Sequence, residues 1–181
     1  MPTIYYTASS IDGFIVDDDA SLDWLTSREI DPGGPFGYQA FAAGVGALVM
    51  GATTYEWLVR HQPGAWMYSQ PSWVLTHRPE IIADGHPVHT FAGDPVELHP
   101  RLVAAAGDRD VWVVGGGRVA AQFAAANLID EMIVAYAPCT LGSGAALLPA
   151  RTEWQLAETG RNGDFPCARW IRPGAPVAPP R

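Results

Sequence analysis

The segment VWVVGGGRVAAQF, residues 111–123, restricts the folds open to this chain more than any other stretch. Its first four residues form a continuous apolar run, typical of a strand that is buried on both faces at the centre of a sheet. Three glycines follow, and the spacing of Val119, Phe123 and Ala126 then predicts a helix with one apolar face. A buried strand that leads through glycines into a helix indicates an α/β fold.

The rest of the chain continues this alternation of strands and helices. We predict strands over residues 3–10, 14–16, 47–51, 72–79, 87–91, 110–114 and 130–138. We predict helices over residues 36–44, 53–61, about 100–106 and 118–128, with Thr53 or Thr54 as the N-cap of the second. A long loop is expected over residues 17–35. Residues 154–173 predict two antiparallel strands around a turn at 160–164. The expected fold class is α/β, with a mostly parallel central sheet and an antiparallel hairpin at its C-terminal end.

Length and composition are those of a globular chain. Of its 181 residues, 48% are hydrophobic and 17% are charged, which favours a packed core over disorder. We expect one domain over residues 1–172 and a mobile, proline-rich tail over residues 173–181. The apolar runs are too short to span a bilayer, and the N-terminus lacks a signal-peptide pattern. We therefore expect a cytoplasmic protein.

Charge and side-chain chemistry exclude several kinds of partner. The formal net charge of -8 argues against nucleic acid and against an anionic membrane surface. All 11 basic residues are arginines, so no lysine can form a Schiff base or act as a general base. Cys139 and Cys167 form neither a disulfide framework nor a CxxC site, and His86 and His89 are predicted to point to opposite faces of a strand. We therefore expect no metal site.

The glycines after the central strand favour a phosphate ligand. Gly115, Gly116 and Gly117 lack side chains that would keep a ligand away from the backbone amides. The helix N-terminus adds about half a positive charge, and Arg118 stands at its start. The spacing is neither that of a Rossmann fingerprint nor that of a P-loop, so a tight turn without a ligand is an open alternative.

Two further strand ends carry polar groups next to the backbone. In LVMGATTYE a strand leads through glycine into a helix with two hydroxyls at its start, and WVLTHRP ends in a hydroxyl, an imidazole and a guanidinium. The residues concerned are Gly51, Thr53, Thr54, Thr76, His77 and Arg78. Because ligands collect at the carboxyl ends of strands in an open α/β sheet, these groups suit a dinucleotide with a 2′-phosphate.

These segments resemble those of dihydrofolate reductases. VVGGGRVAAQF is similar to their glycine segment, LVMGATTYEWL to their MGR-x-T-[WY]-E segment, and VLTHR to their next strand end. SSIDGFI and LIDEMIVAYAPCTLGSGAALLP are more similar to the bacterial branch related to the reductase domain of the riboflavin-biosynthesis protein RibD. The match spans about residues 3–172.

The resemblance implies a fold, a cofactor and a set of contacts. It implies a three-layer fold with a mixed eight-stranded sheet, NADPH as hydride donor, a small-molecule substrate and often a homodimer. It also implies a cis peptide bond in the segment of Gly115 and Gly116. By position, the residues that would contact the cofactor are Ala8, Ile15, Gly51, Thr53, Thr54, Thr76, His77, Arg78, Gly115, Gly116, Gly117, Arg118 and Val119. Ala8 and Ile15 would flank the nicotinamide, and Thr76, His77 and Arg78 would surround the 2′-phosphate.

Some positions depart from the family pattern. Ala52 replaces the arginine of the MGR segment, which removes one cation from the phosphate site. Gly37 stands near the place of the acid that folate reductases carry on their first helix, and Asp31 is a weak substitute. Reduction of folate is therefore not expected.

The likeness to the riboflavin enzymes is also incomplete. They often carry lysines where this chain has Tyr6 and Phe14, and a glutamate where Gly115 stands. These groups contact the ribose-phosphate pyrimidine, so the substrate is left open.

Few residues are candidates for catalysis. Asp12, Asp31 and Tyr6 are candidate proton donors, although Asp12 before Gly13 is also a turn signal. Tyr6, Trp24 and Tyr136 are candidates for binding the substrate. Asp130 and Glu131 are expected to be structural. The sequence predicts an NADPH-dependent reductase of a small heterocyclic or carbonyl compound, with a non-catalytic NADP(H)-binding sensor or interaction module as the alternative.

Overall fold

The computed structural model describes residues 1–175, so residues 176–181 of the predicted tail lie outside the described residues. The strands are β1 (Thr3–Ser10), β2 (Phe14–Val16), β3 (Val45–Gly51), β4 (Ser72–Leu75), β5 (Val88–Phe91), β6 (Asp110–Gly115), β7 (Glu131–Ala137), β8 (Ala145–Ala146), β9 (Gln155–Asn162) and β10 (Phe165–Ile171). The helices are α1 (Asp23–Thr26), α2 (Tyr38–Ala43), α3 (Ala52–His61), α4 (Pro95–Ala106) and α5 (Gly117–Ala125), with a 3-10 turn at Pro79–Ile81.

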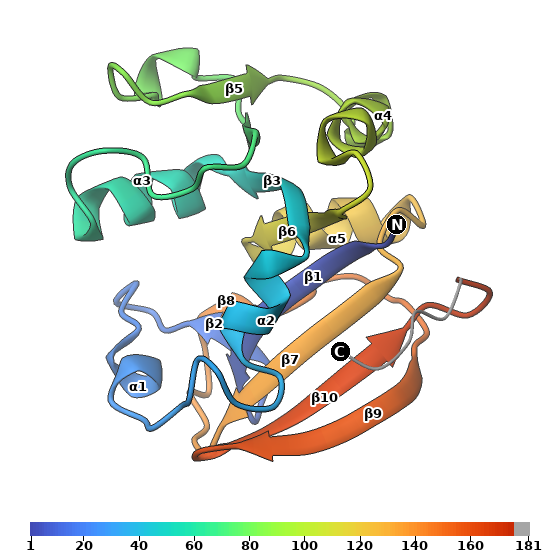
Figure 1. The fold of residues 1–181 in the computed structure, drawn as a ribbon. Helices are drawn as coiled ribbons and strands as arrows, with labels where there is room; N and C mark the ends of the chain where they lie inside the picture. The colour runs from blue at the N-terminus through green and yellow to red at the C-terminus, as the bar shows by residue number, and fades with distance from the viewer. Residues whose placement is uncertain (176–181) are drawn as a thin grey trace.

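An eight-stranded sheet in the order β5-β4-β3-β6-β1-β7-β10-β9 runs through the molecule (Figure 1). The first six strands in this order are parallel, whereas β10 runs antiparallel to both β7 and β9. This confirms the predicted fold class, including the central place of the strand VWVV, which lies in β6. The carboxyl ends of the six parallel strands consequently meet at one edge of the sheet.

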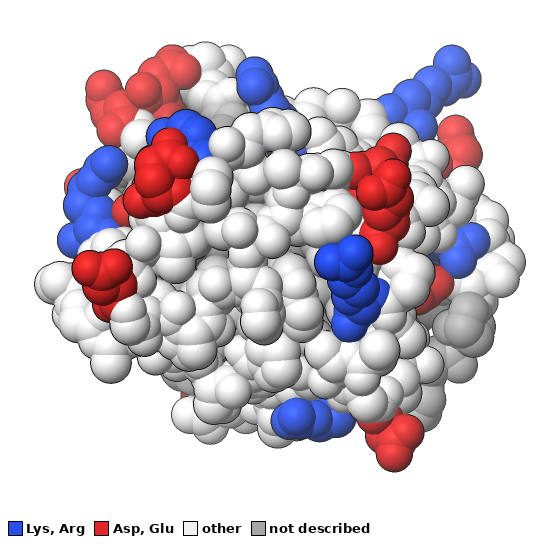
Figure 2. Space-filling model, turned by 90° about the horizontal axis from the view of Figure 1, so that it is seen from above, with Lys and Arg blue, Asp and Glu red and all other residues white. Residues whose placement is uncertain are grey.

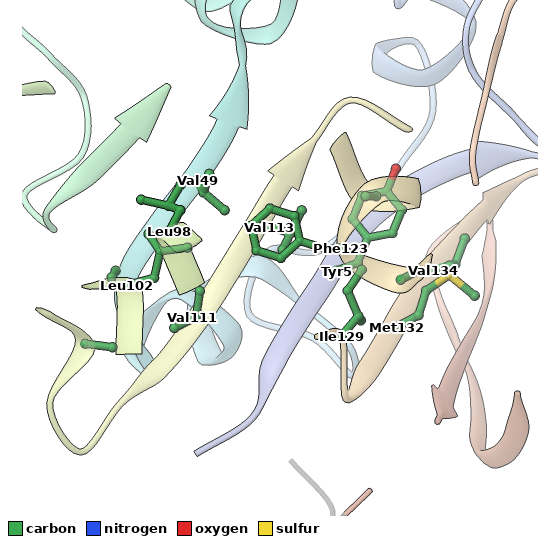
Figure 3. Close-up of a cluster of buried hydrophobic side chains, with 14 residues drawn as sticks. Tyr5, Val49, Leu98, Leu102, Val111, Val113, Phe123, Ile129, Met132 and Val134 are labelled. Carbon is green, nitrogen blue, oxygen red and sulfur yellow. The ribbon is translucent and has the colours of Figure 1, made fainter. Parts of the chain in front are cut away.

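Helices cover both faces of the sheet (Figure 1). On one face, Leu98 of α4 and Phe123 of α5 pack on Tyr5, Val113 and other strand residues (Figure 3). In Figure 3 these apolar side chains follow one another across the strands from Val49 to Val134. The opposite face is covered by α2 and α3, through residues such as Phe41 and Tyr55. Alternate residues of each central strand face the two layers, which explains why β6 is apolar along its whole length.

Some element boundaries differ from the predictions. The N-cap of α3 is Gly51, so neither Thr53 nor Thr54 caps this helix. The strand β4 already ends at Leu75, because the next residues form a turn in which the Arg78 amide donates to the Thr76 hydroxyl. Helix α4 begins several residues before the predicted start, at Pro95, where the Asp94 side chain caps it.

Two short elements have no counterpart in the predictions. The helix α1 lies within the segment expected to be a loop, and β8 pairs with β2 in a separate two-stranded sheet, which we call the strap. A two-residue strand carries no recognisable period, so its pairing partner decides its conformation. The predicted hairpin of β9 and β10 is present, and Gly163 adopts a φ of 57° in its turn.

Charged groups are scattered over the face shown in Figure 2. Basic and acidic side chains stand singly or in small groups, and no continuous basic patch covers the described residues on this side. Among residues 1–175, no helix combines the length and the apolar character needed to cross a bilayer.

Candidate functional site

Three of the strand ends singled out in the sequence lie next to one another. Met50 of β3 pairs with Gly115 of β6, and Gly51 pairs with Leu75 of β4. The glycine segment after β6, the start of α3 and the turn after β4 therefore share the carboxyl edge of the sheet. We call this group of segments the strand edge.

The two helices that start at the strand edge have uncapped N-termini. Gly51 is the N-cap of α3 and Gly116 is the N-cap of α5, and no side chain within residues 1–175 caps either helix. Helix α4 differs, because Asp94 accepts a hydrogen bond from the Val96 amide at its start. The first amides of α3 and α5 thus lack a side-chain acceptor, and the positive ends of both helices face the same edge.

A methyl group would fit at Gly116 without a clash. A Cβ atom placed on Gly116 would lie 3.7 Å from both the Ile15 Cδ1 atom and the Thr54 Oγ1 atom, which is ordinary van der Waals contact. The φ of Gly116 is −74°, so its backbone does not require glycine. The peptide bond between Gly115 and Gly116 is cis, as the resemblance implied. Packing within the chain gives no reason for glycine at position 116, whereas a ligand lying against the backbone would.

The neighbouring glycines have reasons within the protein itself. A Cβ atom on Gly117 would lie 2.0 Å from the Ala146 carbonyl oxygen, so the strap approaches the start of α5 where a side chain would stand. A Cβ atom on Gly51 would lie 2.9 Å from the Val119 Cγ2 atom. The Val119 side chain thus packs on the end of β3. Close packing accounts for Gly51 and Gly117, but not for Gly116.

The cations of the strand edge differ in their pairing. Arg118 is exposed and forms no ion pair with any of residues 1–175. Arg78 is also exposed, but its Nη2 atom lies 3.2 Å from a carboxylate oxygen of Glu56 in α3. His77 and Thr53 are exposed beside these groups, whereas the Thr76 hydroxyl is buried in the turn. Arg118 is therefore the freer of the two guanidinium groups.

Asp12 fastens a loop beside the strap. Its carboxylate accepts hydrogen bonds from the amides of Leu141 and Gly142, at 3.0 and 2.7 Å, and from the Ser10 hydroxyl at 2.6 Å. These donors lower the pKa of Asp12 to about 2, with the Ser10 hydroxyl as the largest cause. The Gly13 amide also closes the expected turn onto the Ser10 carbonyl. At neutral pH the group is an ionised anchor with no proton to give.

The other two candidate proton donors also make structural contacts. The Asp31 carboxylate is exposed and accepts a hydrogen bond from the Gly33 amide at 2.8 Å. The Tyr6 hydroxyl donates to the Phe36 carbonyl at 2.9 Å, and its ring stacks on Phe41 with centroids 4.2 Å apart. Burial raises the pKa of Tyr6 to about 12. None of the three candidates presents an unengaged acidic proton at the strand edge.

The candidate substrate residues do not share one face of the sheet. Tyr6 packs under α2, and Trp24 packs near Ala8 on a small cluster that includes Ala135. Tyr136 follows Ala135 directly, so it points to the opposite face and packs against the core near α5. The three aromatic residues therefore cannot line a single pocket, because strand alternation separates Tyr136 from the other two.

A cavity of about 90 Å³ lies beside Tyr6, between α2 and the sheet. We call it the α2 cavity, and its wall includes Tyr6, Phe36, Phe41, Ile133, Glu158 and Arg169. Arg169 is 3% exposed and holds the fully buried Glu131 through two hydrogen bonds, at 2.8 and 2.9 Å. Glu131 is thus structural, as expected. Asp130 is structural as well, since it accepts from the Thr3 amide and pairs with Arg172.

The sequence interpretation missed a fastening residue next to the α2 cavity. Asn162 accepts from the Asp31 amide and donates to the carbonyls of Asp31 and Pro35, with distances of 2.8 to 2.9 Å. It thereby ties the loop before α2 to the hairpin of β9 and β10. The dipeptide Asn162-Gly163 is a turn signal, and it gave no hint of a partner about 130 residues away.

The eight-stranded sheet, its strand order and the helices on both of its faces form a dihydrofolate reductase-like fold. The chain belongs to the RibD C-terminal domain family, whose profile matches residues 3–160. It is 29% identical over 173 residues to the uncharacterized protein YwjB of Bacillus subtilis (strain 168). The alignment covers 94% of this chain and 97% of YwjB.

Solved structures share this fold. A proposed riboflavin biosynthesis protein from Shewanella sp. PV-4 superimposes with a TM-score of 0.82 at 28% identity, covering 95% of this chain and 99% of the other. RibD of Acinetobacter baumannii superimposes with a TM-score of 0.66 at 18% identity, covering 95% of this chain and 58% of the other. The diaminohydroxyphosphoribosylaminopyrimidine deaminase/5-amino-6-(5-phosphoribosylamino)uracil reductase of Thermotoga maritima superimposes with a TM-score of 0.62 at 16% identity. That match covers 94% of this chain and 56% of the other. The last two show likeness of fold alone.

Proposed function

We propose that this chain is an NADPH-dependent reductase of a small heterocyclic or carbonyl compound. One observation carries the proposal: Gly116, where packing does not require glycine, begins the uncapped helix α5 and lies against Thr54 in the first turn of the uncapped helix α3. Amides without side-chain acceptors, at the positive ends of two helices, suit the diphosphate bridge of a dinucleotide. Membership of the RibD C-terminal domain family supports a reductase role for a chain with such a site.

The residues of the proposed cofactor site divide into phosphate binders and apolar walls. The first amides of α3 and α5, the Thr54 hydroxyl and Arg118 would bind the phosphate oxygens. Ala8 and Ile15 would flank the nicotinamide ring and keep water from it. NADPH, when bound, supplies a hydride to an electrophilic carbon, and the protein contributes position and a dry surrounding.

The structure around Gly37 argues against folate as the substrate. A Cβ atom on Gly37 would lie 2.4 Å from the Pro32 carbonyl oxygen and 2.6 Å from that of Gly34. Both atoms belong to the backbone, so no side chain, and hence no acid, fits at this place. A substrate that does not need a buried carboxylate partner is favoured, with the proton supplied by water or a hydroxyl.

Two variants test the phosphate site. We expect Gly116→Ala to fold normally, since its Cβ atom has room, and to bind NADPH at least about tenfold more weakly, since it fills the ligand's place. Isothermal titration with NADPH and with NADH measures the affinity, and thermal unfolding checks the fold. The matched control is Ala125→Gly, which changes the same methyl group at the far end of α5. Absence of NADPH binding to the unaltered chain at millimolar concentration would refute the proposal.

The alternative is a non-catalytic NADP(H)-binding sensor or interaction module. It is favoured by the structural hydrogen bonds of Asp12, Asp31 and Tyr6, which leave no evident proton donor. Both functions require cofactor binding, so turnover separates them. Oxidation of NADPH above background with any pterin, pyrimidine or quinone of a substrate panel would support the reductase, whereas tight binding without turnover would support the sensor.

A further inference from the structure

A carboxylate stands beside Arg78, which the resemblance places at the 2′-phosphate; we call this part of the proposed site its adenosine end. The Arg78 Nη2 atom lies 3.2 Å from each of the two carboxylate oxygens of Glu56. The Arg78 side chain is 54% exposed and that of Glu56 is 37% exposed, so both remain accessible from solvent. Arg78 follows the end of β4, and Glu56 lies in α3, one helical turn beyond Thr53.

The pair reduces the charge that Arg78 can offer to a ligand. Ala52 and Arg60 each lie four residues from Glu56 on α3, so the carboxylate has an alanine on one side and a cation on the other. The ion pair that the described residues show for Glu56 nevertheless goes to Arg78, in the turn after β4. The guanidinium is therefore partly neutralised before any ligand arrives.

The two ends of the proposed dinucleotide site differ in charge for this reason. Arg118, two residues after Gly116, forms no ion pair with any of residues 1–175. At the adenosine end, the positive charge of Arg78 is matched by the negative charge of Glu56. A 2′-phosphate would gain from Arg78 but would be repelled by Glu56, whereas a ribose 2′-hydroxyl can donate a hydrogen bond to a carboxylate.

We propose that Glu56 is a specificity-determining residue that lets the chain accept NADH alongside NADPH. This inference rests on the proposed dinucleotide site and names its selectivity. Because the pair is solvent-exposed, its effect is moderate: the dissociation constants of the two cofactors differ by less than about tenfold. The free energy that NADPH gains from Arg78 is offset by the carboxylate beside it.

Titration of four proteins with both cofactors tests this inference. They are the unaltered chain, Glu56→Gln, Glu56→Gln combined with Arg78→Ala, and Glu153→Gln as the matched control. Glutamine keeps the size of Glu56 and removes its charge. Glu153 is exposed, and it lines a groove with Asn127, beyond the C-terminal end of α5 and therefore away from the strand edge. Thermal unfolding of each variant verifies that the exposed substitutions leave the fold intact.

The expected result is a change of selectivity in one variant only. Glu56→Gln binds NADPH about two- to fivefold more tightly and NADH about two- to fivefold more weakly, and Glu153→Gln changes neither. In the double variant the tighter binding of NADPH disappears, because Arg78, which Glu56→Gln frees from its ion pair, has been removed. Equal changes for both cofactors, or a preference above about tenfold in the unaltered chain, would overturn the inference. If neither cofactor binds the unaltered chain, the proposed function fails, and that result is distinct from unchanged selectivity.

Discussion

The strand edge and the α2 cavity use their polar groups in opposite ways. At the strand edge the first amides of α3 and α5 have no side-chain cap, and no neighbouring atom requires glycine at position 116. In the wall of the α2 cavity, the Tyr6 hydroxyl donates to Phe36 and the Arg169 guanidinium holds Glu131. The strand edge keeps hydrogen-bond donors available for a ligand, whereas the polar groups around the α2 cavity bond to one another and stabilise the fold.

This difference indicates which region has which role. Polar groups that are already paired in a buried place stabilise one conformation, and a ligand would have to displace their partners. Amides at exposed helix ends are satisfied by water and release it readily to a phosphate. We therefore expect substitutions near the α2 cavity to lower stability, and substitutions at the strand edge to lower cofactor affinity.

The largest expected effect is that of Arg169→Met. It leaves the buried Glu131 carboxylate without its guanidinium, and removing one partner of a buried pair costs about 3–5 kcal/mol. Urea unfolding measures the loss, with the exposed Arg60→Met as the control. If the folded variant also loses NADPH affinity, the two regions are not independent.

Gly117→Ala tests whether close packing requires glycine at position 117 but not at position 116. Its Cβ atom would lie 2.0 Å from the Ala146 carbonyl oxygen, so the strap has to move away from α5. Because this contact is with backbone, we expect a loss of about 3 kcal/mol in unfolding free energy, at the upper end for overpacking. Gly116→Ala, measured in the same unfolding experiment, should stay within about 0.5 kcal/mol of the unaltered chain. Equal losses for both variants would contradict the assignment.

Asn162→Ala tests the fastening of the loop before α2. The substitution removes hydrogen bonds to the Asp31 and Pro35 backbone, and we expect a loss of about 1–2 kcal/mol. Hydrogen exchange of the amides over residues 31–37 should become faster, while that of α5 should not change. Unchanged exchange over residues 31–37 would show that other contacts hold the loop.

The smallest effect is expected at low pH and involves Asp12. Its folded pKa of about 2 lies below the ordinary value of 3.8, so its stabilising effect is complete above pH 3.8 and is lost as the pH falls toward 2. Asp12→Asn should therefore reduce the dependence of stability on pH between about 4 and 2. Thermal unfolding across this range is the measurement, and Asp19→Asn, at an exposed position, is the control. Identical pH profiles for Asp12→Asn and the unaltered chain would exclude this role.

Local patterns in the sequence determined most of the fold and the place of the strand edge. The apolar run of β6, the glycines after it and the helix beyond it lie within 13 residues, 111–123. Strand period, helix period and glycine turns depend on neighbours in the chain, so the elements could be predicted. The parallel order then brought the ends of β3, β4 and β6 together, because consecutive parallel strands end at the same edge.

Only the tertiary structure decided what the individual residues do. The sequence alone gave the three consecutive glycines the same interpretation. In the structure the strap requires glycine at position 117, whereas a Cβ at Gly116 would make only ordinary contacts. From the sequence, Asp12 was a candidate catalytic residue and Asn162 was part of a turn signal. In the structure each side chain accepts a backbone hydrogen bond from a segment about 130 residues away. No sequence pattern singled out Glu56, and only the fold brings its carboxylate next to the Arg78 guanidinium. Such roles depend on contacts between distant segments, which residue type and local spacing do not encode.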